Sequence, residues 1–142
     1  MEKKNNEYEL SYFAPDTVLE GTIRSAGDVE VAGEFKGEIE AQGKVVLRSK
    51  IQGNVTSDSL KLQGCDLEGD VKVKGAVSIS EDSVVHGNVS ADELQCGGSV
   101  TGDLLIGDDT VLEETAKVTG NIKTGTVAVM RGAKIQGGLE TE

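Results

Sequence analysis

The five residues Leu19-Glu20-Gly21-Thr22-Ile23 contain the pattern on which the chain is built: apolar, any residue, glycine, any residue, apolar. The pattern occurs eight times, and its glycines are Gly21, Gly37, Gly53, Gly69, Gly87, Gly102, Gly120 and Gly137. Consecutive glycines lie 15 to 18 residues apart, so each repeat has nearly the same physical length. A repeat of this period indicates a stacked repeat architecture.

Two further columns of residues keep the same register. A small residue stands two positions before the first apolar residue of every repeat: Thr17, Gly33, Ser49, Cys65, Ser83, Gly98, Ala116 and Ala133. An alternating pair follows each of the first seven glycines after seven or eight residues: Val29/Val31, Val45/Leu47, Leu60/Leu62, Val77/Ile79, Leu94/Cys96, Thr110/Leu112 and Val127/Val129. Thr110 is the exception to the apolar rule in these pairs.

The apolar spacing predicts strands and turns rather than helices. From Thr17 onward apolar residues alternate with polar ones, which is the period of a half-buried strand. Each repeat offers three short strands, which are too short for a hairpin meander. Stacked three-sided coils let each strand pair in parallel with its equivalents in the neighbouring coils. We therefore predict an all-β fold, a single-stranded parallel β-helix of about eight coils and a rod roughly 38 Å long at ~4.8 Å per coil.

The order of residues at the repeated glycine indicates a corner. Gly53, Gly69, Gly87, Gly102 and Gly120 are each followed by Asn or Asp, the reverse of the order that favours a two-residue hairpin turn. Glycine provides room or positive φ, and a short polar side chain can bond to nearby main chain. The variable gap between the alternating pair and the next repeat predicts outward loops at residues 80–83, 113–116 and 130–133.

Length and composition predict one domain in 142 residues. The expected parts are a flexible N-terminal tail at 1–16, the β-helix at 17–139 and a short C-terminal tail at 140–142. Three interpretations of the leader, with Leu10, Tyr12 and Phe13, stay open: a short strand over the first coil, a contact with a membrane or partner, or a disordered segment.

The formal net charge of −11, with the 14 basic residues scattered, disfavours binding to nucleic acid. No apolar run approaches the ~18 to 20 residues that span a bilayer, and no signal peptide is evident, so we expect a cytoplasmic protein. Cys65 and Cys96 both fall on interior columns too far apart for a disulfide, and are expected to be buried thiols.

The register from Gly21 to Gly137, with its apolar-x-Gly-Asn/Asp-apolar corners, resembles that of the bactofilins, polymer-forming bacterial cytoskeletal proteins. The resemblance covers about 125 residues of the chain. It implies a right-handed, triangular β-helix that joins end to end into non-polar filaments without nucleotide or any cofactor. It also implies a scaffold for cell-shape or envelope-synthesis partners, and an N-terminal tail that often tethers such proteins to the inner face of the membrane.

The physics of a β-helix also favours polymerisation. Its two ends present unpaired strand edges above an exposed aliphatic layer, and no amphipathic helix is available to cover them. The candidate polymer interface consists of the apolar residues of the first and last coils: Leu19, Ile23, Val29, Val31, Val127, Val129, Ile135 and Leu139.

The alternative is a β-helical enzyme or ligand-binding protein that forms a closed oligomer, as acyltransferases of the left-handed β-helix type do. His86 is the single histidine and the one plausible base, and it is expected to face outward in a mixed polar column. Asp108-Asp109 and Glu113-Glu114 could gather carboxylates for a cation, but carboxylates in loops are usually solvated. We predict no catalytic residue and no metal site. We also predict no nucleotide site, because no glycine-rich stretch carries the Lys-Ser/Thr of a phosphate loop.

Overall fold

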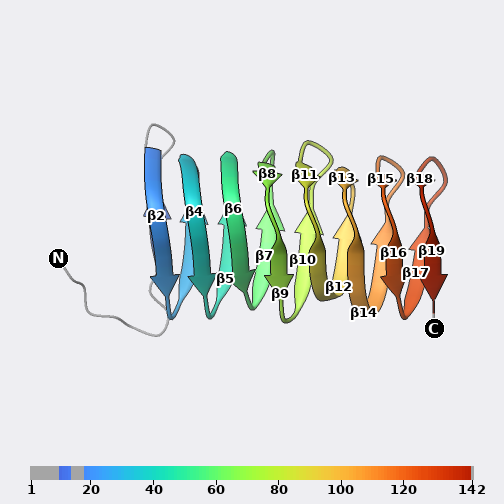
Figure 1. Ribbon diagram of the computed structural model, residues 1–142, viewed down its shortest axis with the longest axis horizontal. Coiled ribbons are helices and arrows are strands. Elements are labelled where there is room, and N and C mark those ends of the chain that lie inside the picture. The colour runs from blue at the N-terminus through green and yellow to red at the C-terminus, as the bar shows by residue number, and fades with distance from the viewer. Residues whose placement is uncertain (1–9, 14–17, 142) are drawn as a thin grey trace.

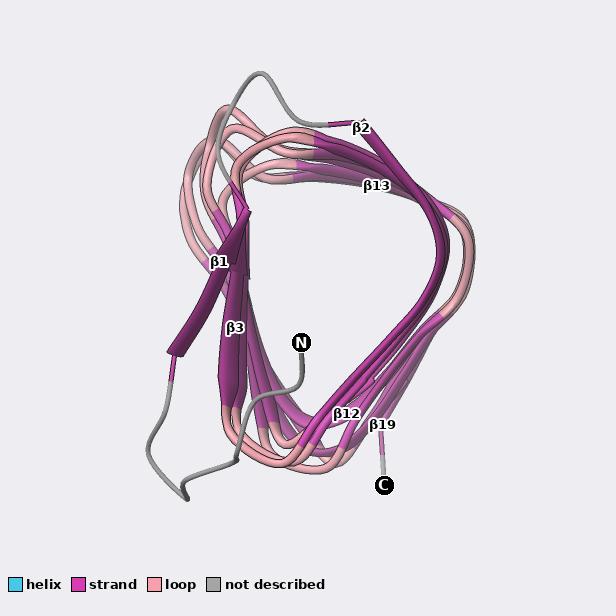
Figure 2. Ribbon diagram, turned by 90° about the vertical axis from the view of Figure 1, so that its left-hand side faces the viewer, coloured by secondary structure: helices cyan, strands magenta, loops and turns pink. Residues whose placement is uncertain are grey.

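The structure is a computed structural model that describes the backbone of residues 10–13 and 18–141 and the side chains of residues 20–141. These residues form strands and turns with no helix, and the strands belong to one 19-stranded sheet. Viewed from the side, the strands line up as successive rungs of a rod (Figure 1). Viewed along the rod from its N-terminal end, the coils superpose on a rounded triangle (Figure 2). The predicted all-β fold and parallel β-helix are confirmed.

Each coil has three sides. The first side precedes the corner glycine, the second follows it, and the third carries the alternating pair. In the first three coils one strand covers both the first and second sides: β2 (Val18–Ser25), β4 (Glu34–Ala41) and β6 (Lys50–Ser57). Later first sides are β8 (Asp66–Glu68), β11 (Val84–His86), β13 (Ser99–Thr101), β15 (Lys117–Thr119) and β18 (Lys134–Gln136).

Later second sides are β9 (Val71–Val73), β16 (Ile122–Thr124) and β19 (Leu139–Thr141), while β12 (Val89–Cys96) and β14 (Leu104–Leu112) cover both the second and third sides. The remaining third sides are β3 (Asp28–Val31), β5 (Lys44–Leu47), β7 (Ser59–Leu62), β10 (Ala76–Ile79) and β17 (Thr126–Val129), and β1 (Leu10–Phe13) pairs with the outer edge of β3. In Figures 1 and 2 the chain runs clockwise as it recedes from a viewer at the N-terminal end, so the coil is right-handed.

Parallel pairing keeps equivalent residues of successive coils in register. Val18 to Ser25 pair one-to-one with Glu34 to Ala41, so Gly21 lies beside Gly37, and Gly37 lies beside Gly53. Apart from one register shift between β12 and β14 at residues 91–93, this pairing is kept from coil to coil, so the inward residues of each side form aliphatic ladders. Leu47, Ile51 and Leu67 are among the fully buried side chains. The core is therefore a narrow column of Val, Ile and Leu along the axis of the rod.

The corner column requires glycine for two reasons. The eight corner glycines have φ between 133° and 146°, a region that residues with a Cβ rarely adopt. A Cβ on Gly53 would lie 1.6 Å from the carbonyl oxygen of Gly37 in the preceding coil. The glycines thus allow both the bend and the close stacking of the coils.

The Asn or Asp that follows the corner glycine stitches the coils together. The side-chain oxygens of Asn54, Asp70, Asn88, Asp103 and Asn121 each accept a hydrogen bond from the backbone N–H of the equivalent residue in the next coil, at 3.0 to 3.4 Å. The predicted corner therefore bonds between coils as well as bending the chain. Alternation of Asn with Asp separates the charged carboxylates along this exposed ladder.

Thr110, the exception among the alternating pairs, is buried and paired with a second buried threonine. Its Oγ1 donates to Oγ1 of Thr124 at 2.9 Å, and Thr124 Oγ1 donates in turn to the carbonyl oxygen of Thr126, also at 2.9 Å. Both side chains are 1% exposed. The polar pair is accepted in the core because both hydroxyl groups are hydrogen-bonded.

The ends of the coil differ from the boundaries expected for the tails. Leu10–Phe13 falls in the expected N-terminal tail but forms β1, which pairs in parallel with β3. β19 runs to Thr141, past the expected end of the β-helix at 139. In both places a short extended segment pairs with an open edge, which satisfies backbone groups that would otherwise lack a partner in the sheet. Residues 1–9, 14–17 and 142 lie outside the described residues.

Candidate functional site

The C-terminal end of the rod is an open surface made by β17, β18 and β19. Each of these strands pairs on the side facing the preceding coil, with β14, β15 and β16 respectively. Among the described residues, no strand pairs with their outer edges. Their free N–H and C=O groups can therefore accept another strand, as at the edge of any open sheet.

Aliphatic side chains surround these free edges. Val129 is 45% exposed and Leu139 is 44% exposed, and both are among the few large apolar side chains that the described part of the chain exposes. Val127 and Ile135 are half-buried against the coil beneath. Complete burial of a Val or Leu side chain contributes about 1.5–3 kcal/mol, so covering the exposed halves of Val129 and Leu139 contributes roughly 2 kcal/mol. This surface combines strand edges with an apolar layer.

The charges on the last coil do not oppose an approach to this surface. Within residues 126–141, which hold β17, β18 and β19, the charged side chains are Arg131, Lys134 and Glu140, and all three are exposed. The terminal rung thus carries a net charge of only +1. Its inward side chains are apolar, apart from Thr141.

The N-terminal end differs, because β1 lies over part of it. β1 pairs with β3 in the register Ser11 to Val29 and Phe13 to Val31. Val29 and Val31 are both 0% exposed, so they are internal to the chain. Ile23 on β2 is half-buried and packs against the core. The structure describes side chains from Glu20 onward. The side chains of Leu10, Tyr12, Phe13 and Leu19 are therefore not among those described.

The residues considered for catalysis or metal binding are not brought together. His86 is exposed on β11, between Glu68 of the coil before and Thr101 of the coil after. Asp108 lies in β14 just before its third-side stretch and Asp109 begins that stretch beside Thr126 of β17, whereas Glu113 and Glu114 follow the end of the strand. Glu113 accepts a hydrogen bond from Nε2 of Gln95 at 2.6 Å. Among the residues that the structure describes, no group of three or more His, Cys, Asp or Glu side chains is arranged to hold a metal ion.

Both cysteines are free and buried, as the interior columns predict. Burial raises the pKa of the Cys65 thiol from 9.0 to about 12 and that of the Cys96 thiol from 9.0 to about 11. The thiols therefore stay protonated at neutral pH. A protonated, buried thiol is a poor nucleophile, which identifies both cysteines as core side chains.

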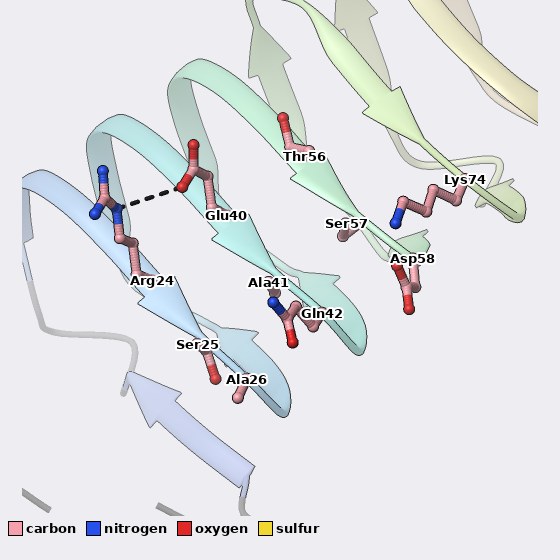
Figure 3. A pocket seen from close by; sticks show the side chains of 10 residues that line it. All are labelled: Arg24, Ser25, Ala26, Glu40, Ala41, Gln42, Thr56, Ser57, Asp58 and Lys74. Carbon is pink, nitrogen blue, oxygen red and sulfur yellow. Dashed lines mark ion pairs between the residues drawn. The ribbon is translucent and has the colours of Figure 1, made fainter. Parts of the chain in front are cut away.

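Sequence reasoning missed a shallow hollow of about 440 Å³ on the second side of the first four coils. Small side chains at the corner between the second and third sides leave this space, and the ion pair between Arg24 Nε and Glu40 Oε1, 3.3 Å apart, crosses one edge (Figure 3). The lining residues are Arg24, Ser25, Ala26, Glu40, Ala41, Gln42, Thr56, Ser57, Asp58 and Lys74. No histidine or cysteine lines the hollow. The small residues at the end of each second side are the sequence feature from which the hollow could have been predicted.

Comparisons with known proteins agree with this architecture. Residues 11–65 and 48–140 match the family model described as "Bactofilin: Polymer-forming cytoskeletal". Over 93 residues the chain is 25% identical to bactofilin BacO of Myxococcus xanthus (strain DK1622). The aligned region covers 65% of this chain and 73% of that relative. No solved structure gives a significant match.

Proposed function

The chain belongs to the bactofilin family of polymer-forming cytoskeletal proteins, and we propose that it assembles end to end into filaments without nucleotide. Its role is structural and cytoskeletal, as the family description states. The observation that carries the proposal is the open C-terminal end, where three unpaired strand edges surround the exposed side chains of Val129 and Leu139.

The proposed mechanism is strand addition. A second copy extends the sheet by pairing with the free edges, and at the same time covers the terminal aliphatic layer. Each new strand pair satisfies backbone groups, and the apolar contact adds the favourable free energy of burial. Because every coil has the same triangular outline, an added molecule continues the rod with the same cross-section (Figure 2).

Burial alone can drive this assembly, so it requires no nucleotide. The chain has no glycine-rich loop followed by Lys-Ser/Thr, the sequence that usually holds nucleotide phosphates. We propose that the protein is not an enzyme, because the family to which it belongs is described as cytoskeletal.

The sides of the rod would remain available to other molecules in such a filament. We propose that the protein works in the cytoplasm and that the sides of the filament serve as a scaffold for cell-shape or envelope-synthesis partners. Leu10, Tyr12 and Phe13 are the candidate contacts for a partner or for the inner membrane surface. Within the described part of the chain, no helix is long and apolar enough to cross a membrane.

Sedimentation of the purified chain tests this proposal. The protein is dialysed against EDTA and centrifuged at high speed over a range of concentrations, with and without added ATP or GTP. We expect the same pelleted fraction in every buffer above a threshold concentration. A nucleotide requirement would contradict the proposed mechanism, and a soluble oligomer of fixed size would favour the closed-oligomer alternative.

A further inference from the structure

We propose that β1 is a removable cover over a second joining surface at the N-terminal end, and that another copy of this chain occupies the surface when β1 leaves. This inference rests on the proposed assembly and specifies how one end is controlled. The structural basis is that this short strand covers the edge of β3. Without β1, that edge would resemble the open C-terminal end of the rod.

The pairing of β1 is one-sided. β1 pairs with β3 through four residues, and among the described strands it has no other partner. In contrast, β5 pairs with both β3 and β7. Strands that end a sheet and pair along one edge open at low free-energy cost compared with central strands. β1 is therefore suited to detach while the rest of the rod stays folded.

β1 also departs from the outline of the coils. In the view along the rod, β3 and the strands behind it superpose on one side of the triangle, whereas β1 leans outward from that side (Figure 2). A regular rung would follow the outline and offer the next strand a matching edge. β1 closes the edge of β3 without continuing the coil, so it acts as a cover rather than as an added rung.

The surface beneath β1 matches an end of the same molecule. Val29 and Val31 form its inward layer, and Ile23 continues that layer on the second side of the coil. Glu30 faces outward and pairs with Arg48, with Oε2 and Nη2 3.2 Å apart, so its charge does not enter the layer. Removing β1 leaves a strand edge above an aliphatic layer, the same chemistry as the open C-terminal end. The occupant that fits is the end of another copy.

A reversible crosslink tests the cover in the full-length chain. Tyr12 and Glu30 are paired in register, and paired residues of neighbouring strands lie ~4.8 Å apart, within the Cα range of a disulfide. In the variant Y12C/E30C, oxidation should hold β1 on β3. Cys65 and Cys96 are buried and should not react. The single variant E30C controls for loss of the pair with Arg48.

Sedimentation velocity should show the oxidised Y12C/E30C protein as monomers, or as dimers joined at the C-terminal ends. After reduction it should assemble like E30C. Filaments of equal length in the oxidised and reduced states would overturn the proposal, because assembly would then proceed with β1 in place.

A second variant tests the opposite direction. In S11P/Y12P, two adjacent prolines remove N–H groups from β1 and should release it from β3. We expect this variant to assemble at a several-fold lower concentration than the unmodified chain. If the unmodified chain forms no filaments, the proposed function fails, but S11P/Y12P should still gain dimers through the uncovered end. If S11P/Y12P had the same size distribution as the unmodified chain, the proposal that β1 covers a joining surface would be wrong.

Discussion

Val31 and Val129 occupy the same position of the coil at opposite ends of the rod, yet Val31 is 0% exposed and Val129 is 45% exposed. The register connects them through the intervening third-side strands, from Val31 beside Leu47 to Leu112 beside Val129. β1 lies above Val31, whereas no strand among the described residues lies above Val129. The two ends are thus built from the same repeat but differ in whether they are covered.

A charge on the open end should prevent assembly. In Leu139→Lys, the ammonium group would have to lose its hydration when a second copy covers it, so we expect the pelleted fraction to fall to the background level. Leu139 is 44% exposed, and the substitution should lower the free energy of unfolding by no more than about 1 kcal/mol. Circular dichroism checks the fold, and sedimentation checks the assembly.

Leu105→Lys is the matched control for this variant. Leu105 is 55% exposed, but it faces outward from β14 in the middle of the second side and not from an end. We expect filaments of normal length with Lys at this position. If Leu105→Lys also abolished them, lateral contacts rather than the ends would be responsible for polymerisation.

The corner column should tolerate a methyl group at its first position far better than in its middle. Gly53→Ala places Cβ 1.6 Å from the carbonyl oxygen of Gly37, whereas Gly21→Ala has similar positive φ and meets no atom within 4 Å. Gly21→Ala should cost about 1–2 kcal/mol from φ strain alone, and Gly53→Ala at least about 4 kcal/mol. Thermal unfolding of both variants measures the difference in the free energy of unfolding. Equal losses in the two variants would show that close stacking of the coils is not what requires glycine at the corner.

The buried threonine pair predicts an asymmetric result. Thr124→Val removes the acceptor of the Thr110 hydroxyl and leaves that group buried without its partner, which should cost about 1–3 kcal/mol. Thr110→Val leaves Thr124 bonded to the carbonyl oxygen of Thr126, so it should cost less. Urea unfolding of the two single variants and the double variant measures the coupling. A larger loss for Thr110→Val than for Thr124→Val would contradict this hydrogen-bond order.

The thiols make stability depend on alkaline pH. Because the folded pKa values of Cys65 and Cys96 are raised from 9.0 to about 12 and about 11, the unfolded state releases these protons first as pH rises. Their contribution is fully present below pH 9 and is lost from there toward pH 11 to 12, by up to about 1.4 kcal/mol per pH unit for each thiol. The slope of unfolding free energy above pH 9 should be shallower in Cys65→Ala/Cys96→Ala; an unchanged slope would contradict the raised pKa values.

Most of the fold follows from the sequence, because each repeated feature reports one physical requirement. The column from Gly21 to Gly137 marks the corner with positive φ, and the alternating pairs mark the inward ladder of the third side. Even the loops at residues 80–83, 113–116 and 130–133 are located by the lengths of the gaps, and tight turns such as the bond from Ser83 N–H to the Ser80 carbonyl oxygen close them.

The ends of the rod were harder to predict, because the repeat pattern contains no information about which segment covers a terminal coil. The pattern treats Val29 and Val31 like Val127 and Val129, since all four are inward residues of a terminal coil. The leader that pairs with β3 contains no repeat glycine, so no column placed it in register. Thr110 likewise had no sequence signal for its bond to Thr124, which depends on contact between the second and third sides.

Cryo-electron microscopy of the purified full-length chain, in buffer without nucleotide or metal ions, tests end-to-end assembly most directly. We expect thin filaments whose width is that of one rod and whose power spectrum has a meridional layer line at ~4.8 Å, because the strands of every coil run across the filament axis. Discrete particles of fixed size would contradict end-to-end assembly, and so would filaments whose ~4.8 Å spacing lies away from the meridian, because rods would then associate through their sides.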